Sequence, residues 1–239
     1  MKPDLRPMLA TLTDKPFHDP GWIFETKWDG FRLMAEIKDG SVALYSRNLI
    51  DLSRKYPSVC AALSGLHRFA VIDGELVALD ARGRSRFQLL QNAEREKVRL
   101  RYCAFDLLYL DDKDLREHPL IERKQMLEKI LPRDPLLQYS THVWGKGIAA
   151  FKRAARACEE GVMAKLATSH YYSGQRTREW LKVKASLGQE VSLSASPRRA
   201  GRGNISARLC LPCARAMAGA MSAALGAAST ASRSNPCTL

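Results

Sequence analysis

The segment ETKWDGFR places Lys27 directly after a strand-like run and three residues before Gly30. An amine attacks phosphorus only when it is neutral, and burial or nearby cations favour that form. The glycine would permit a tight turn after the lysine. Lys27 is therefore a candidate nucleophile for attack on a phosphate. A short KxDG segment also occurs by chance, and the lysine would then be a surface charge.

Five further segments could supply the rest of a phosphoryl-transfer site. They are SRN at 46–48, DGE at 73–75, FDLL at 105–108, EGVMAK at 160–165 and WLKVK at 180–184. Such chemistry needs positioning and charge neutralisation, which carboxylates with a metal ion and several Lys or Arg side chains provide. No GxxxxGK[ST] loop is present, so a P-loop nucleotide site is excluded.

Each segment also has a structural interpretation that competes with the functional one. Phe105 could be plain core, and Glu75 and Glu160 could be solvated acids at strand ends. Lys182 and Lys184 could form the exposed face of a strand, since they are two residues apart. We expect Trp180 to serve in packing.

The elements that must position these residues are mostly strands. The runs WIFETKW, FRLMAEI, VALYS, FAVIDGELVALD and RLRYCAFDLLYL are β-rich with partial alternation, and Asp39-Gly40 predicts a hairpin turn. LIERKQMLEKIL and KGIAAFKRAARACEEG have helical spacing, and Gly161 is expected to end the second helix. The pattern predicts an α+β, antiparallel-sheet fold without βαβ repetition.

Composition favours a polyanionic partner. The chain has 239 residues and a formal charge of +13, which suits nucleic acid, although a solvated basic surface is an alternative. It has no signal-peptide pattern and no apolar run long enough to span a bilayer. We therefore expect no membrane partner and a cytoplasmic location.

In this order the six segments resemble motifs of the covalent nucleotidyltransferase superfamily of DNA ligases, RNA ligases and capping enzymes. RPMLATLTDKPFHDPGWIFETKWDGFR with SRNLIDLSRKYP resembles the ligase module of bacterial end-joining ligases, often called ligase D. The resemblance covers residues 1–190 and implies an ATP-grasp-like adenylation domain of an ATP-dependent DNA ligase.

The resemblance also implies roles for individual residues. Lys27 matches the nucleophile that receives AMP, and Phe105 the ring that stacks on adenine. Glu25 matches a position that helps hold adenine, and Arg32 and Arg47 match two arginines that bind the nucleotide. Glu75 matches the acid of the ribose and metal site, and Lys182 and Lys184 match two lysines at the α-phosphate. Glu160 joins Glu75 as a metal ligand.

The implied reaction has three steps: Lys27 takes AMP from ATP, AMP passes to a 5′-phosphate, and the 3′-hydroxyl seals the nick. Its cofactors would be ATP and Mg²⁺ or Mn²⁺, with oxygen-rich ligation typical of magnesium. The partners would be nicked duplex DNA and a Ku-like end-binding protein, in a bacterial cytoplasm at the nucleoid. The alternatives are an RNA ligase or capping-type enzyme, and a non-catalytic nucleic-acid-binding remnant.

The composition changes after Glu190: residues 191–239 contain six arginines and no acidic residue. A one-base shift of suitable codons turns VSLSASPRRAG into FVVGFTAPSG, and the later shifted text includes FGAL, which resembles the start of the OB-fold domain in such ligases. We therefore expect residues 191–239 to be a disordered basic tail, produced by a frameshift that replaced the OB-fold domain.

Overall fold

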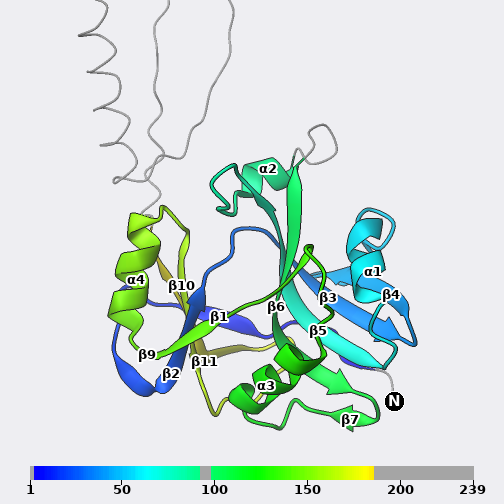
Figure 1. Ribbon diagram of the computed structural model, residues 1–239. Coiled ribbons are helices and arrows are strands. Elements are labelled where there is room, and N and C mark those ends of the chain that lie inside the picture. Colours follow the sequence, from blue (N-terminus) through cyan, green and yellow to red (C-terminus); the bar gives the residue numbers. More distant parts are fainter. Residues whose placement is uncertain (1–2, 92–97, 186–239) are drawn as a thin grey trace, which may run out of the picture. The chain divides into compact units, whose positions relative to one another are not determined.

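The computed structural model describes residues 3–91 and 98–185 (Figure 1). Within them lie four helices: α1 (Pro57–Leu63), α2 (Phe87–Gln91), α3 (Leu120–Ile130) and α4 (Gly147–Arg156). The strands are β1 (Leu9–Leu12), β2 (Asp19–Thr26), β3 (Phe31–Lys38), β4 (Ser41–Ser46), β5 (Ala70–Leu79), β6 (Arg99–Leu110), β7 (Lys113–Asp114), β8 (Leu137–Tyr139), β9 (His142–Gly145), β10 (Gly161–Leu166) and β11 (Arg176–Lys184).

These strands form two sheets. The first sheet has the order β1-β11-β10-β2-β9, and the second has the order β4-β3-β5-β6-β7 with β8 added beside β6. The predicted α+β fold with antiparallel sheet is confirmed, as are the five strand runs and both helices. Two pairs, β1 with β11 and β6 with β8, are parallel and were not anticipated.

The prediction that Gly161 ends the second helix was wrong. Helix α4 ends at Arg156, and Cys158 takes the left-handed conformation (φ 54°) that usually falls to glycine. The N–H of Glu159 donates to the carbonyl of Ala154 (3.0 Å), which completes a Schellman-type end. Gly161 instead begins β10, where a Cβ atom would lie 2.1 Å from the carbonyl oxygen of Val183.

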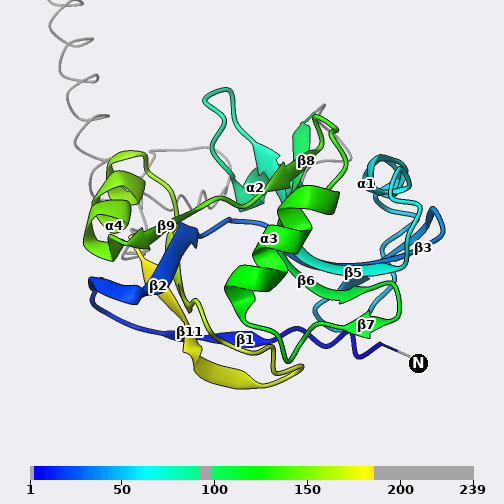
Figure 2. The same ribbon diagram turned by 60° about the horizontal axis from the view of Figure 1, so that its bottom comes forward.

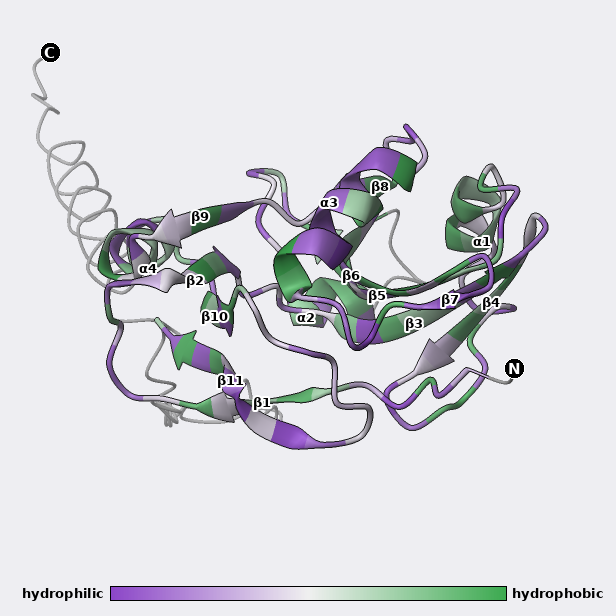
Figure 3. Ribbon diagram, turned by 90° about the horizontal axis from the view of Figure 1, so that it is seen from below, coloured by the Kyte–Doolittle hydropathy of each residue, from purple (hydrophilic) through white to green (hydrophobic). Residues whose placement is uncertain are grey.

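Side-chain alternation gives each sheet one face toward the other. Along β11, Trp180 and Lys182 are separated by Leu181, whose side chain packs on the opposite side with α4. In Figure 3 hydrophilic and hydrophobic colours follow one another along the strands. The face between the sheets thus receives charged residues from the same strands that supply apolar residues to the outer cores.

Three principal cores hold this arrangement. Helix α4 covers the outer face of the first sheet through Ala150 and Ala154, and α1 and α3 lie on the second sheet with Val59 and Leu127 (Figures 1 and 2). A third core joins the two sheets to each other and contains Met8, Ile23, Met34, Val71, Phe105, Leu108, Tyr109, Leu120, Ala167, Tyr171 and Trp180. The two sheets are therefore packed at fixed positions around the space between them.

Two further expectations concern the tail and membrane-spanning segments. Residues 191–239, for which the sequence predicts a disordered basic tail, lie outside the described residues. Among the residues that are described, no helix has the length and apolar character needed to cross a membrane.

Candidate active site

A cavity of about 620 Å³ opens between the two sheets. Strands β1, β2, β10 and β11 line it from the first sheet, and β3, β5 and β6 line it from the second. Seven of the predicted site residues contribute to the lining: Glu25, Lys27, Arg32, Arg47, Glu75, Phe105 and Lys182. The cavity therefore gathers side chains that are as far apart in the chain as β2 and β11.

Lys27 follows β2 in a short connection to β3 that is fixed at several points. Its N–H donates to the carbonyl of Gly161 (3.0 Å), and the Trp28 indole donates to Ser140 Oγ (3.1 Å). Asp29 accepts from the N–H of Phe87 at the start of α2 (3.1 Å). The connection thus holds Lys27 at the cavity without relying on the lysine side chain.

Glycine is required at position 30 by close packing and not by the tight turn that the sequence suggested. A Cβ atom at this position would lie 2.1 Å from the carbonyl oxygen of Leu76, so only glycine lets the chain approach β5 so closely. The KWDG segment therefore needs its glycine for packing against the second sheet.

Glu160 contacts the candidate nucleophile directly. Its Oε2 atom lies 2.5 Å from Lys27 Nζ, and both side chains keep about a fifth of their surface exposed (17% for Lys27 and 23% for Glu160). Glu160 sits just before β10, while Lys27 sits just after β2, and these two strands are paired. Strand pairing therefore produces the ion pair.

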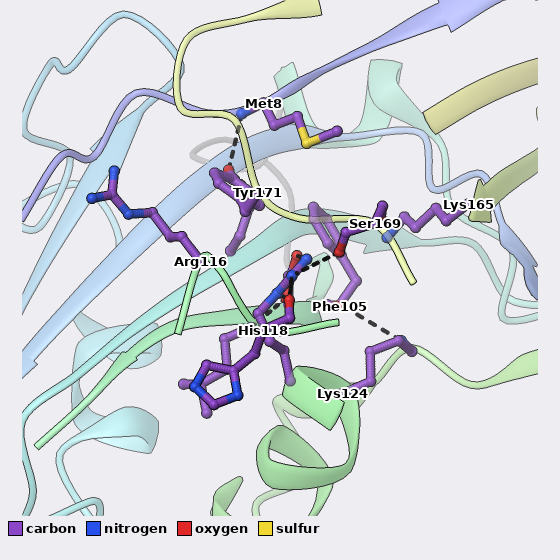
Figure 4. Close-up of polar contacts among 12 residues, drawn as sticks. Met8, Phe105, Arg116, His118, Lys124, Lys165, Ser169 and Tyr171 are labelled. Atoms are coloured by element: carbon purple, nitrogen blue, oxygen red, sulfur yellow. Dashed lines mark hydrogen bonds and ion pairs between the residues drawn. The ribbon is translucent and has the colours of Figure 1, made fainter. Parts of the chain in front are cut away.

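Arg32 is held by a buried acid. Its guanidinium forms a two-pronged ion pair with Asp73 (2.9 and 2.5 Å), and Tyr171 donates its hydroxyl to the same carboxylate (2.7 Å). The Tyr171 hydroxyl also accepts from the N–H of Met8 (3.0 Å), as Figure 4 shows. The Asp73 carboxylate raises the pKa of Arg32 despite its burial, so the guanidinium stays charged.

Glu75 lies opposite Arg32 on the neighbouring strand. Burial raises the pKa of its carboxyl to about 8; Arg32 and Lys27 oppose this shift, and the acids Asp73 and Glu160 add to it. A carboxyl that is costly to ionise beside another acid is a position where a bound cation would be stabilising.

The acids fit the expected divalent metal. Mg²⁺ commonly binds through one or two carboxylates together with substrate phosphates and water, and Glu75 and Glu160 both lie near Lys27. Over the described ranges, no group of three or more His, Cys, Asp or Glu side chains is arranged to hold a metal ion. The fit therefore rests on two protein carboxylates completed by phosphate oxygens.

Glu25 lies in a buried charge cluster. Its carboxylate contacts Lys124 Nζ (2.8 Å) and Lys165 Nζ (3.0 Å), and Ser140 donates a longer hydrogen bond of 3.3 Å. Burial opposes ionisation of Glu25, but the two ammonium groups outweigh it and lower the carboxyl pKa. The side chain predicted to help hold adenine is thus already engaged by two lysines.

Lys165 connects this cluster to the aromatic wall of the cavity. Its ammonium lies 4.2 Å from the ring centre of Phe105 and 4.3 Å from that of Trp180, and the two rings pack edge to face. Burial lowers the pKa of Lys165, and Lys124 adds to the effect. Lys165, the last residue of the EGVMAK segment, therefore lies within the candidate site.

The remaining predicted residues differ in exposure. Lys182 lines the cavity, and desolvation together with the nearby Lys27 and Arg176 lowers its pKa. Arg47 lines the cavity from an exposed turn after β4. Lys184 is exposed and does not contribute to the lining.

Sequence reasoning missed several residues of the site, including Asp73, Lys124, Tyr171 and Arg176. Lys124 lies on α3, whose buried face consists of Leu120, Arg123, Lys124 and Leu127. That spacing is a helical stripe, but two of its four members are charged, and charged positions normally face solvent. Asp73 stands next to Gly74 in the DGE segment, which was the available signal for its place in the site.

A lysine beside a cavity rich in cations, with two acids and an aromatic wall, is the arrangement that the sequence led us to expect for a covalent nucleotidyltransferase. The family model described as "ATP dependent DNA ligase domain" matches residues 7–184. The chain belongs to this family.

Relatives of the chain within this family include end-joining LigD proteins. The chain is 39% identical over 192 residues to the multifunctional non-homologous end joining protein LigD of Pseudomonas aeruginosa, covering 78% of this chain and 22% of that protein. It is 38% identical over 202 residues to LigD of Mycobacterium tuberculosis, covering 84% and 26%. The chain spans about a quarter of the length of these relatives.

Solved structures agree with the fold. A mycobacterial DNA ligase D complexed with ATP and MES is 36% identical with a TM-score of 0.71, covering 79% of this chain and 62% of that one. The Chlorella virus DNA ligase-adenylate has a TM-score of 0.55 at 18% identity, covering 80% and 73%, which shows the fold alone. The expected adenylation-domain fold is thereby confirmed.

Proposed function

We propose that this chain carries the adenylation domain of an ATP-dependent DNA ligase and that Lys27 is its nucleophile. The observation that carries the proposal is the position of Lys27 at a cavity lined by Arg32, Arg47 and Lys182, with Glu160 in contact with its amine. In the first step the Lys27 ammonium loses a proton to solvent, a bond forms between Nζ and the α-phosphorus of ATP, the bond from that phosphorus to the bridging oxygen breaks, and pyrophosphate leaves.

The chain's own residues supply binding and charge. Phe105 gives the adenine ring an aromatic surface, while Glu25 with Lys165 presents polar groups beside that surface. Lys182 offers its ammonium to the α-phosphate, and Lys184 extends the same strand face outward. Arg32, kept rigid by Asp73, and Arg47 provide planar donors for ribose and phosphate oxygens.

A divalent ion, Mg²⁺ or Mn²⁺, would be held by Glu75 and Glu160 together with phosphate oxygens. When bound, such an ion neutralises phosphate charge and orients the leaving group. Glu160 contacts Lys27, and Glu75 interacts electrostatically with both, so these are the carboxylates available to hold such an ion.

For later steps we propose nicked duplex DNA as the substrate, held chiefly through its phosphates. Residues 1–190 keep a net charge of +7 once the six arginines of residues 191–239 are set aside from the total of +13, and this charge and the likeness to end-joining LigD proteins support the proposal. The same likeness supports DNA end joining, a Ku-like partner and a bacterial, nucleoid-associated place in the cytoplasm.

Competition experiments test the substrate class. Purified protein with Mg²⁺ is given ATP or GTP, and then a nick in DNA or in RNA that already bears AMP. We expect AMP transfer from ATP over GTP and sealing of the DNA nick over the RNA nick. Preference for GTP or for the RNA nick would favour a capping-type enzyme or RNA ligase, and binding without either reaction would favour a non-catalytic remnant.

We propose further that residues 191–239 come from a shifted reading frame and do not supply the OB-fold domain that follows adenylation domains in this family. The support is the composition, which changes after Glu190 to a segment with six arginines and no acidic residue. Self-adenylation of the 239-residue chain should then be weak, and sealing of a pre-adenylated nick better retained. Restoring the frame at the Glu190 codon should raise self-adenylation strongly; robust sealing from ATP by the unaltered chain would contradict this.

A further inference from the structure

The turn after β4 carries two consecutive exposed apolar side chains, Leu49 (45% exposed) and Ile50 (59%). Within the described ranges, the only other large apolar side chains with comparable exposure are Leu12 and Trp144. Single exposed apolar residues are ordinary, but two in succession at the tip of one turn form a small apolar surface.

The turn holds these side chains outward. The carbonyl oxygen of Ser46 accepts a hydrogen bond from the N–H of Leu49 (2.9 Å), and its hydroxyl oxygen accepts one from the N–H of Ile50 (3.1 Å). The N–H of Ser46 donates to the carbonyl of Ile50 (2.9 Å). Leu49 has φ 61°, a left-handed conformation that is unfavourable for a leucine. The surrounding hydrogen bonds thus hold an exposed leucine in an unfavourable backbone conformation.

The apolar tip is continuous with the candidate site. Ile50 and its neighbours Arg47 and Asn48 line the cavity that contains Lys27. Arg47 brings a positive charge to one side of the tip. The acid Asp51 follows Ile50, but its carboxylate accepts two hydrogen bonds from Ser53, which lower its pKa. The tip therefore combines an apolar surface with an arginine at the mouth of the cavity.

We propose that Leu49 and Ile50 pack against the sugar edges of a nucleic acid duplex beside the nick, while Arg47 contacts an adjacent phosphate. This inference rests on the proposed function and extends it to a defined contact surface. A groove of a duplex alternates apolar sugar edges with charged phosphates, and apolar side chains flanked by arginine are complementary to that surface. The contact reads no sequence and adds a salt-independent component to binding.

Salt dependence separates this contact from an electrostatic one. Binding of the full chain to a nicked duplex bearing 5′-AMP is measured across a salt series. Ile50→Ser combined with Leu49→Gly should weaken binding about tenfold at every salt concentration and leave the slope of log affinity against log salt unchanged. Arg47→Ala should weaken binding and reduce that slope by about 1. Trp144→Gln, which removes an exposed apolar side chain from β9, is the matched control and should bind as the parent does.

The Leu49→Gly change keeps the double variant folded. Glycine adopts a positive φ readily, so the melting temperature of the double variant should equal or exceed that of the parent. If the parent binds the nicked duplex and the double variant binds within twofold of it, or changes the salt slope, the inference is wrong. If the parent itself does not bind or seal the nick, the proposed function fails first.

Discussion

Lys27 Nζ and Glu160 Oε2 lie 2.5 Å apart, so the candidate nucleophile and a candidate metal ligand are paired with each other. The pair joins two neighbouring strands of the first sheet at the edge of the cavity. Because both side chains remain partly exposed, we expect the pair to contribute at most about 1 kcal/mol to folding. Its importance would therefore be chemical.

Glu160→Gln keeps the shape of the side chain and removes its charge. In the chain with its frame restored, we expect self-adenylation to fall at least tenfold and to require more Mg²⁺ for half-maximal rate, with little change in melting temperature. Glu159→Gln, at the adjacent position, is the control and should behave as the parent. Parental rates at parental Mg²⁺ concentrations in Glu160→Gln would remove Glu160 from the metal site.

Asp106 and Arg123 form a fully buried ion pair with contacts of 2.8 and 2.9 Å. Asp106→Asn would leave the arginine charge without its partner in the core, which typically costs about 3–5 kcal/mol. Asp111→Asn removes the acid of the exposed Arg68 pair and should cost about 1 kcal/mol or less. Denaturant unfolding of both variants checks the difference, and equal losses would contradict the burial argument.

Tyr171 connects the Arg32 and Asp73 pair to the N-terminal segment. Tyr171→Phe would deprive the buried N–H of Met8 and the carboxylate of Asp73 of a partner, at a cost of about 1–3 kcal/mol. Tyr172→Phe changes the neighbouring, partly buried ring and should stay within about 0.5 kcal/mol of the parent. A parental unfolding free energy for Tyr171→Phe would show that the hydroxyl does not hold the network.

Glu75 gives stability a pH dependence of known sign. Its pKa is about 8 in the folded protein and near the ordinary value of 4.5 when unfolded. Between these values the unfolded chain releases the proton more readily, so this group's contribution to stability declines as pH rises from 4.5 to 8. The melting temperature of Glu75→Gln minus that of the parent should therefore be larger at pH 9 than at pH 5. A difference that does not vary with pH would contradict the raised pKa.

The elements of the fold were largely predictable because strand alternation and helical spacing are local. The strands from β2 to β6 follow runs visible in the sequence, whereas the end of α4 depended on Cys158 accepting a conformation more typical of glycine. The two parallel strand pairs required knowledge of distant partners. The sequence patterns carry no such information.

The candidate site was predictable through motifs and not through packing. The motifs marked Lys27 and Glu160, but Glu25 meets Lys165 across 140 positions of the chain, and Asp73 meets Tyr171 across 98. Lys124 was hidden because charges on an amphipathic helix are ordinarily solvated. Such buried charge clusters become visible only when the two sheets are brought together.

The most direct test is to trap the covalent intermediate. Protein is incubated with ATP labelled at the α-phosphate and Mg²⁺, denatured, and analysed for label and for the modified peptide, using both the 239-residue chain and the chain with its frame restored. We predict that the label is on Lys27, weak in the 239-residue chain and strong in the chain with its frame restored. The Lys27→Ala variant should lose the label, and the Lys15→Ala variant should keep it. Label that survives denaturation equally in Lys27→Ala, or that maps to another lysine, would contradict the account.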